Sequence, residues 1–253
     1  MKLEIRHRKI DNIPILEVVD QEKIYEKLPL IIYYHGWQTQ KELVLTQGRK
    51  LAKQGFRVVL PDAANHGERK TEVSAIPSLT FWQSIHTNLF EFSFIVDFFR
   101  HMDLVDWIGV GGVSMGGMTT CGLLVHHPEI SVAACVMGSP DYLEYRAALK
   151  KNIIQRGYSL PIDYDLLTGW IEDYDLNSLY SKVSKRPLLF WHGTEDEKIP
   201  YEQVANFVDQ NQGDEISFHT ANERHLVKGE TMDLVTDFFV TQYQESQNEK
   251  SSN

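Results

Sequence analysis

Short apolar runs recur along this chain, and the stretches between them carry helical periodicity. A continuous apolar run of five to eight residues is typical of a strand buried on both faces of a parallel sheet. Such strands alternating with helices indicate an α/β fold, with a mostly parallel central sheet and helices on both faces. The runs cover Leu28–Tyr34, Phe56–Leu60, Val105–Gly111, Ser131–Met137, Pro187–Trp191 and Ile216–Thr220.

The first twenty residues show a different pattern, in which apolar and polar residues alternate. This alternation predicts two strands, Lys2–Lys9 and Ile13–Val19, joined by a turn at Asp11-Asn12. We expect an antiparallel pair ahead of the parallel strands.

The longest helical pattern follows the second buried run. Thr80 and Gln83 are spaced as in a capping box, which marks a helix start. Apolar residues then recur every three or four positions on one face, and we interpret that face as core. These residues are Trp82, Ile85, Leu89, Phe92, Val96 and Phe99. Further helices are predicted up to Gln54, and at Met115–His127, Tyr201–Gln210 and Met232–Tyr243.

The alternation of strands and helices breaks between residues 139 and 186. This segment has no buried-strand run and is rich in tyrosine and tryptophan. We expect a helical cap inserted into a single domain that spans residues 1–243, because the composition does not change midway. The last stretch, residues 244–253, is polar and is predicted to be a frayed tail.

Composition and charge narrow the possible partners. The 253 residues are 42% hydrophobic and carry a formal charge of −10, without a cluster of basic residues. We therefore expect no nucleic-acid or membrane partner. The sequence lacks the apolar core of a signal peptide, and Cys121 and Cys135 lie in apolar patterns without metal-ligand spacing. Two buried free thiols favour the cytoplasm, whereas the oligomeric state is left open.

Candidate chemistry begins at the turn between the strand Val105–Gly111 and the following helix. The segment Gly112-Val-Ser114-Met-Gly116 matches the nucleophile elbow G-x-S-x-G. In this motif the turn lifts the serine hydroxyl above the sheet, and the closely packed strand and helix leave little room for side chains at the two glycines. The phosphate-binding alternatives fail, because the dinucleotide fingerprint would need a third glycine at Ser114 and a P-loop would need Lys at Gly117.

A serine nucleophile needs a histidine to accept its proton and a carboxylate to orient that histidine. With this elbow the order along the chain is serine, acid, histidine. Asp196 and His225 each follow a late strand, at the carboxyl edge where open α/β sheets form their sites. We predict them as partners of Ser114. The competing acids are Glu195, Glu197 and Asp141, and the competing histidine is His219.

An acyl-transfer site also needs backbone N–H groups that bind the oxyanion. We predict the N–H of Met115, which follows the nucleophile, and that of Trp37 in the turn after Leu28–Tyr34. Asp62 and His66 lie in a polar loop nearby, but two potential ligands are weak evidence for a metal. We expect no metal and interpret this loop as the pocket rim.

In combination, these motifs resemble a known family over nearly the whole chain. The matching segments are Tyr34–Trp37, Pro61–Gly67, Gly111–Gly117, Trp191–Asp196 and Arg224-His225. They are similar to the small bacterial carboxylesterases of the α/β-hydrolase superfamily, in the branch related to prolyl oligopeptidase and dienelactone hydrolase. The resemblance implies the α/β-hydrolase fold, a catalytic triad of Ser114, Asp196 and His225, and no cofactor. Dienelactone hydrolases use cysteine where this chain has Ser114.

The expected function is a serine carboxylesterase that acts on a small-molecule ester through an acyl-enzyme. Trp37, Tyr142, Tyr145 and Trp170 are expected to line the substrate pocket, and such bulky walls favour short acyl groups. Alternatively, the aromatic residues of the cap pack it onto the body. The same triad would serve a thioesterase or a small aminopeptidase, and a hydrolase-fold binding protein without catalysis is a further alternative.

Overall fold

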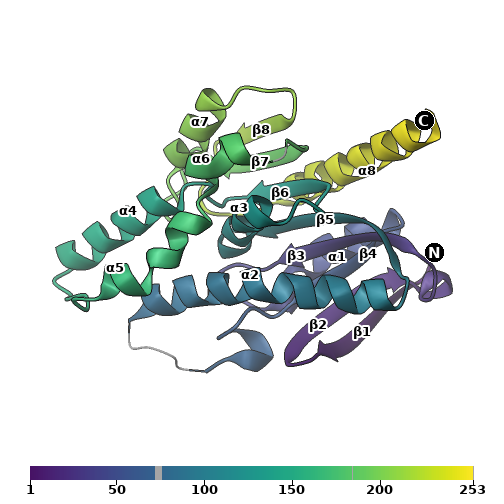
Figure 1. The fold of residues 1–253 in the computed structure, drawn as a ribbon, viewed down its shortest axis with the longest axis horizontal. Helices are drawn as coiled ribbons and strands as arrows, with labels where there is room; N and C mark the ends of the chain where they lie inside the picture. The colour runs from purple at the N-terminus through teal and green to yellow at the C-terminus, as the bar shows by residue number, and fades with distance from the viewer. Residues whose placement is uncertain (72–75, 184, 253) are drawn as a thin grey trace.

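A computed structural model describes residues 1–71, 76–183 and 185–252. Within these ranges the chain forms an eight-stranded sheet of order β1-β2-β4-β3-β5-β6-β7-β8 (Figure 1). Strands β3 to β8 run parallel, and β2 pairs antiparallel with both β1 and β4. The bounds are β1 Leu3–Ile10, β2 Ile13–Asp20, β3 Leu28–Tyr34, β4 Arg57–Pro61, β5 Val105–Val113, β6 Val132–Val136, β7 Leu188–Gly193 and β8 Ile216–Ala221. The predicted fold class and the antiparallel pair at the start are confirmed.

Helices connect the strands and cover both faces of the sheet. The α-helices are α1 Leu45–Lys53, α2 Pro77–His101, α3 Met115–His126, α4 Tyr142–Gln155, α5 Tyr164–Leu167, α6 Leu176–Leu179, α7 Tyr201–Gln210 and α8 Gly229–Ser252. The 3-10 helices are η1 Gln21–Lys23, η2 Lys41–Val44, η3 Gly67–Arg69, η4 Gly169–Asp173 and η5 Tyr180–Lys182. None of these helices is long and apolar enough to cross a membrane in the part of the chain that the structure describes.

The sheet separates two hydrophobic cores. Side chains from α2, α3 and α7 pack on one face, and side chains from α1 and α8 pack on the other. The stripe along α2 belongs to the first core, where Trp82, Phe92 and Phe99 are buried. Each such aromatic removes a large apolar surface from water, so this helix is held firmly against the sheet.

Two helix boundaries differ from those expected. Helix α2 starts at Pro77, before the predicted capping box at Thr80, because proline at the first turn already fits the helical backbone. Helix α8 continues past Tyr243 to Ser252, where the sequence predicts a frayed tail. Local bonds support this extension, since Ser246 Oγ donates to Tyr243 O and Gln242 Nε2 donates to Glu245 Oε2. A helix that is polar all round leaves no periodic signal.

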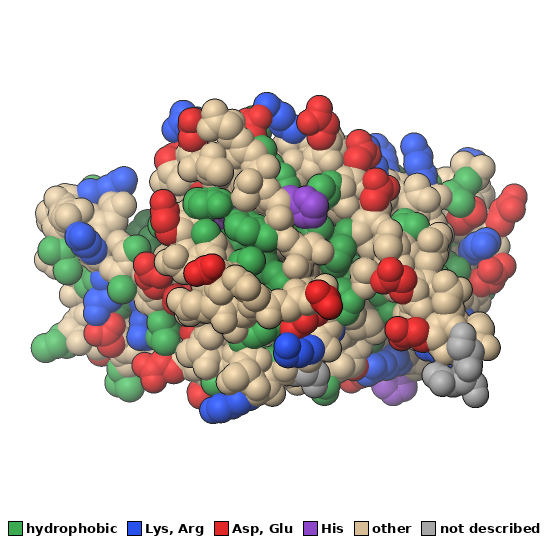
Figure 2. All heavy atoms as spheres, turned by 90° about the horizontal axis from the view of Figure 1, so that it is seen from above, with side chains coloured by type: hydrophobic (Ala, Val, Ile, Leu, Met, Phe, Trp, Pro, Cys, Tyr) green, Lys and Arg blue, Asp and Glu red, His purple; other side chains and the backbone are tan. Residues whose placement is uncertain are grey.

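The segment between β6 and β7 consists of short helices, α4 to α6 with η4 and η5. Figure 1 shows α4 and α5 at one end of the molecule. Figure 2 shows that apolar and basic side chains are exposed at the same end. The large exposed apolar side chains here include Ile154, Tyr158, Ile162 and Leu166.

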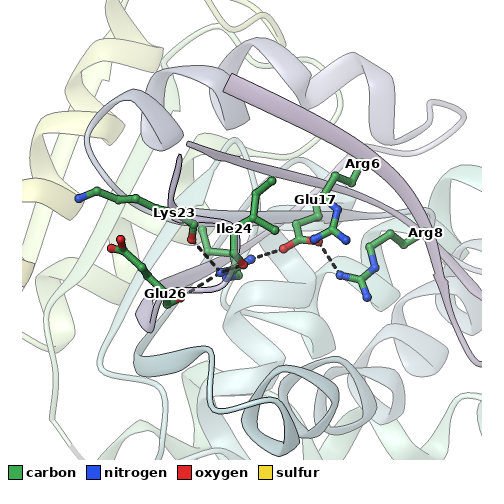
Figure 3. Close-up of polar contacts among 7 residues, drawn as sticks. Arg6, Arg8, Glu17, Lys23, Ile24 and Glu26 are labelled. Carbon is green, nitrogen blue, oxygen red and sulfur yellow. Dashed lines mark hydrogen bonds and ion pairs between the residues drawn. The ribbon is translucent and has the colours of Figure 1, made fainter. Parts of the chain in front are cut away.

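A buried ion cluster ties the antiparallel strands to the rest of the sheet. Glu17 on β2 is fully buried and pairs with Arg8 at 2.8 Å, with Arg6 at 3.3 Å and with the buried Arg57 of β4 (Figure 3). Loss of the Glu17 carboxylate would leave the Arg57 charge buried without its acid, which is strongly destabilising. Arg57 also donates to the backbone carbonyls of Lys23, Ile24 and Glu26.

Candidate active site

Ser114 lies at the turn between β5 and α3, at the carboxyl edge of the sheet. Its backbone has φ 56° and ψ −117°, a conformation that residues with a side chain rarely adopt. Close packing around the turn requires glycine, because a Cβ on Gly112 would overlap the backbone of Gly116, and a Cβ on Gly116 would overlap that of Tyr34. The turn therefore has the strained geometry that the elbow motif predicts.

The structure brings Ser114, His225 and Asp196 together in one hydrogen-bonded row. His225 Nε2 lies 2.8 Å from Ser114 Oγ, and His225 Nδ1 lies 2.7 Å from Asp196 Oδ2. Asp196 Oδ1 accepts the backbone N–H groups of Lys198 and Ile199, which hold the carboxylate in place. Because a carboxylate faces Nδ1, that nitrogen carries the hydrogen, and Nε2 is free to accept the serine proton.

The competing acids and the competing histidine lie elsewhere. Asp141 caps α4 by accepting the N–H of Glu144, and it also accepts from Asn177. His219 is exposed on the edge strand β8. Glu197 accepts the backbone N–H of His225 at 3.3 Å and so approaches the histidine without facing its ring, whereas Glu195 is exposed.

Asp196 has a further partner that sequence reasoning missed. His192 Nε2 lies 3.2 Å from Asp196 Oδ2, and both side chains are fully buried. Burial alone would raise the pKa of Asp196, but hydrogen bonds from His192, His225 and the backbone outweigh it and hold the pKa well below its usual range. The available signal was a histidine at the end of a buried strand, four residues before the predicted acid.

Two histidines anchor the loop that contains Trp37. His35 Nε2 accepts the N–H of Ala63 at 3.0 Å, and His66 Nε2 accepts the N–H of Gln38 at 3.0 Å. The hydrogen of each ring is therefore on Nδ1, which lies 2.8 Å from Gly36 O in His35 and 2.9 Å from the carbonyl of residue 64 in His66. The polar loop predicted as a pocket rim thus holds the loop after β3 in place.

The anchored loop lies beside the nucleophile. A Cβ on Gly36 would be 3.5 Å from Ser114 Cβ, so the backbone passes next to this residue. Gly36 O accepts the N–H and the hydroxyl of Thr39. Because the N–H of a trans peptide points opposite its carbonyl, these bonds turn the Trp37 N–H away from Thr39. Asp62 steadies the loop after β4, which contains His66, by accepting a hydrogen bond from Nζ of the buried Lys41 at 2.6 Å.

The buried His35 makes folding stability depend on pH. Burial lowers the pKa of His35 from 6.5 to about 4, against a smaller opposing effect of its bond to Gly36 O. Between these pH values the unfolded chain binds a proton that the folded protein does not. Stability is therefore present in full above pH 6.5 and is lost as the pH falls to about 4, by about 3 kcal/mol from this group.

Urea unfolding of the wild type and of His35→Gln at pH 7 and pH 4.5 checks this expectation. The variant cannot titrate at residue 35, and all other groups occur in both proteins, so the difference between the two pH dependences isolates His35. We expect the variant to lose less stability on acidification. Equal losses in both proteins would contradict this assignment.

The aromatic residues expected in the pocket divide into two groups. Trp37 packs against Phe81 at 5.5 Å, and Phe81 packs against Tyr145 at 5.8 Å, so that three rings form a row. Burial, with a smaller effect of the Asp196 charge, raises the pKa of Tyr145 to about 12. Phe81 was missed in the sequence because it adjoins the core stripe of α2.

Tyr142 and Trp170 lie in packing contacts between the cap helices and the body. Tyr142 is fully buried, and its hydroxyl donates to Met118 O. Trp170 stacks on His86 at 4.2 Å and contacts Trp82. Among the described residues, no group of three or more histidine, cysteine or acidic side chains could hold a metal ion.

Comparison with known proteins places this geometry in a family. Residues 91–245 match the prolyl oligopeptidase family. The chain is 34% identical to the putative esterase YitV of Bacillus subtilis over 214 residues, which are 82% of this chain and 84% of that protein. It is 27% identical to the esterase YjfP of Escherichia coli over 244 residues, which are 94% of this chain and 98% of that protein.

Among solved structures, TT1662 from Thermus thermophilus is similar in fold, with a TM-score of 0.74 and 16% identity, covering 96% of this chain and 98% of that one. The comparisons confirm the α/β-hydrolase superfamily, its esterase branch and the serine-hydrolase class that the sequence motifs predict. The chain belongs to the prolyl oligopeptidase family.

Proposed function

We propose that this protein is a serine carboxylesterase that hydrolyses short-chain carboxylic esters through an acyl-enzyme on Ser114. The row of hydrogen bonds from Ser114 through His225 to Asp196 is the observation that carries this proposal. The names of the two bacterial relatives, an esterase and a putative esterase, also support it.

In the proposed reaction, His225 Nε2 takes the proton of Ser114 Oγ as that oxygen attacks the ester carbonyl. The tetrahedral intermediate collapses when its C–O bond to the alcohol breaks, and the alcohol leaves with the proton held by His225. A water molecule then gives a proton to Nε2 and attacks the acyl-enzyme. Collapse of the second intermediate returns the proton to Ser114 Oγ and releases the acid. Asp196 stays ionised throughout and stabilises the imidazolium.

We assign the oxyanion hole to the backbone N–H groups of Met115 and Trp37. Met115 begins α3 directly after the nucleophile. The Trp37 N–H belongs to a loop that passes beside Ser114 and that hydrogen bonds of His35 and His66 anchor. Donors that are already fixed stabilise the oxyanion without a cost for reorganisation, and each contributes about 3 kcal/mol.

A short acyl pocket fits the aromatic row. Trp37 lies in the loop beside Ser114, and Phe81 packs between Trp37 and Tyr145. A hollow of about 570 Å³ beside Trp37 has mostly polar side chains around it, among them Gln38 and Lys70, and we assign it to the alcohol part of the ester. We further propose that residues 139–186 are a cap over a domain formed by residues 1–243.

Phe81→Ala is expected to shift the preferred acyl length upwards. The wild type should hydrolyse p-nitrophenyl acetate and butyrate best, because the three rings fill the space that a longer chain would need. Removing one ring opens that space, so kcat/KM for octanoate should rise relative to acetate by about tenfold. Phe90→Ala, an exposed phenylalanine on the same helix, is the control. A wild-type kcat/KM that keeps rising beyond octanoate would refute the short pocket.

Labelling with an active-site phosphonate, followed by mass spectrometry of peptides, tests the proposed function. We expect one adduct, on Ser114, and loss of ester hydrolysis in proportion to labelling. A chain that binds esters without an adduct would be a binding protein. Parallel assays with acyl-CoAs and aminoacyl anilides distinguish a thioesterase or an aminopeptidase, for which these substrates would exceed p-nitrophenyl esters in kcat/KM.

We also propose a cytoplasmic location. Cys121 and Cys135 are both buried free thiols, and free cysteine pairs persist in reducing compartments.

A further inference from the structure

The carboxylate of Asp196 lies between two imidazole rings. His225 Nδ1 is 2.7 Å from Asp196 Oδ2, and on the other side His192 Nε2 is 3.2 Å from the same oxygen. His192 belongs to β7 and is fully buried, so its ring is fixed by the sheet itself. The proposed triad accounts for the first ring and gives no role to the second.

The contacts of His192 define which nitrogen carries its hydrogen. Nε2 faces two acceptors, Asp196 Oδ2 at 3.2 Å and the backbone carbonyl of Ile199 at 2.9 Å. A nitrogen that lies this close to two acceptor oxygens must carry a hydrogen. His192 Nδ1 is buried and has no hydrogen-bond partner among the described residues. The ring is therefore a donor through Nε2, directed at the loop that contains the acid.

This single N–H joins both ends of a short loop. Asp196 begins the loop and Ile199 ends it, and the bonds from Lys198 N and Ile199 N to Asp196 Oδ1 are internal to it. Such internal bonds fold the loop but do not attach it to the sheet. The backbone N–H of Asp196 reaches Gly193 O at the end of β7, and the contact from His192 adds an attachment at the carboxylate itself, at the oxygen that also faces His225.

We propose that His192 is a positioning residue for the reaction, which holds the Asp196 carboxylate in the orientation that His225 requires. This inference rests on the proposed function. Glu197 accepts the backbone N–H of His225, and Tyr145 belongs to α4. Neither of these groups can donate from the sheet. Removing the His192 N–H would leave Oδ2 with His225 as its one donor, so that the carboxylate could pivot about its Oδ1 bonds and move Oδ2 away from His225 Nδ1.

Two amide variants provide a matched test. In glutamine the amide nitrogen is four bonds from Cα, as Nε2 is in histidine, whereas in asparagine it is three bonds away, at the place of Nδ1. His192→Gln can therefore donate to Asp196 and His192→Asn cannot, although both put a neutral amide in the same buried place. His192→Leu removes the donor altogether. Steady-state kinetics on p-nitrophenyl butyrate and thermal unfolding are measured for each.

We expect kcat to fall about 10- to 100-fold in His192→Asn and His192→Leu, as for the loss of one buried hydrogen bond to a charged group, with KM within about twofold of wild type. His192→Gln should recover kcat to within about threefold. Equal losses in the Gln and Asn variants at similar unfolding temperatures would overturn the inference, because a packing role does not depend on the reach of the amide. Wild-type kcat in all three variants would overturn it as well.

The phosphonate separates this inference from the function on which it rests. Wild-type protein that forms no adduct on Ser114 would contradict the proposed function, and the inference with it. An adduct that forms at the same rate in the wild type and in His192→Asn would contradict the inference alone. We expect labelling to slow in His192→Asn and to recover in His192→Gln, since the reagent needs the same activated serine.

Discussion

Replacing Ser114 by alanine is expected to lower kcat for ester hydrolysis by about 10⁶-fold while the fold stays intact. The substitution removes one hydroxyl, whose oxygen lies 2.8 Å from His225 Nε2. Alanine and serine both carry a Cβ, so the positive φ of this turn costs the variant no more than it costs the wild type. The oxyanion donors and the pocket remain, but no group is left to form the acyl-enzyme.

Ser78→Ala is the matched control. This serine is also buried, and its hydroxyl has no hydrogen-bond partner in the part of the chain that the structure describes. Its loss should change kcat by less than about twofold. Activity is measured on p-nitrophenyl acetate, and circular dichroism compares the folds. A Ser114→Ala protein that kept a tenth of wild-type turnover would remove Ser114 from the mechanism.

Signals that repeat or that follow a fixed order could be predicted from the sequence. The buried strands are continuous apolar runs, and the order of serine, acid and histidine needs only that each follows a strand at the same edge of the sheet. Ser114, Asp196 and His225 are far apart in the sequence, yet parallel strands bring their ends together. The sequence therefore led to three residues that the structure connects by hydrogen bonds.

Side chains that take part in both packing and the site could not be separated by pattern. Phe81 adjoins a helical stripe that is mostly core, and only its contacts with Trp37 and Tyr145 distinguish it from that stripe. His192 ends a buried strand, where a histidine gives no periodic signal. The sequence places His66 in a pocket rim but does not reveal that it anchors a loop, because its bond to Gln38 N joins two loops that are separate in the sequence. Each of these roles depends on a tertiary contact.

Asp196→Asn is expected to lower kcat by about 10⁴-fold, because it reverses the hydrogen bonding of the row. Two backbone N–H groups, from Lys198 and Ile199, point at the position of Oδ1, so the amide oxygen of asparagine will occupy it. The amide NH₂ then takes the position of Oδ2 and donates to His225 Nδ1. That bond favours the tautomer with hydrogen on Nε2, which cannot accept the serine proton.

The contact with His192 increases the effect. The N–H of His192 would face the new NH₂ group at 3.2 Å, so that two donors meet where the wild type has a donor and an acceptor. The control is Asp141→Asn at the competing acid, which caps α4 and accepts from Asn177. That variant should lose at most a few-fold in kcat and keep its stability to within about 1 kcal/mol, because asparagine caps a helix about as well as aspartate. Steady-state kinetics and urea unfolding on both variants decide between the two acids. If Asp141→Asn lowers kcat more than Asp196→Asn does, the assignment of Asp196 is wrong, because the reaction needs the charge of the acid that orients the histidine.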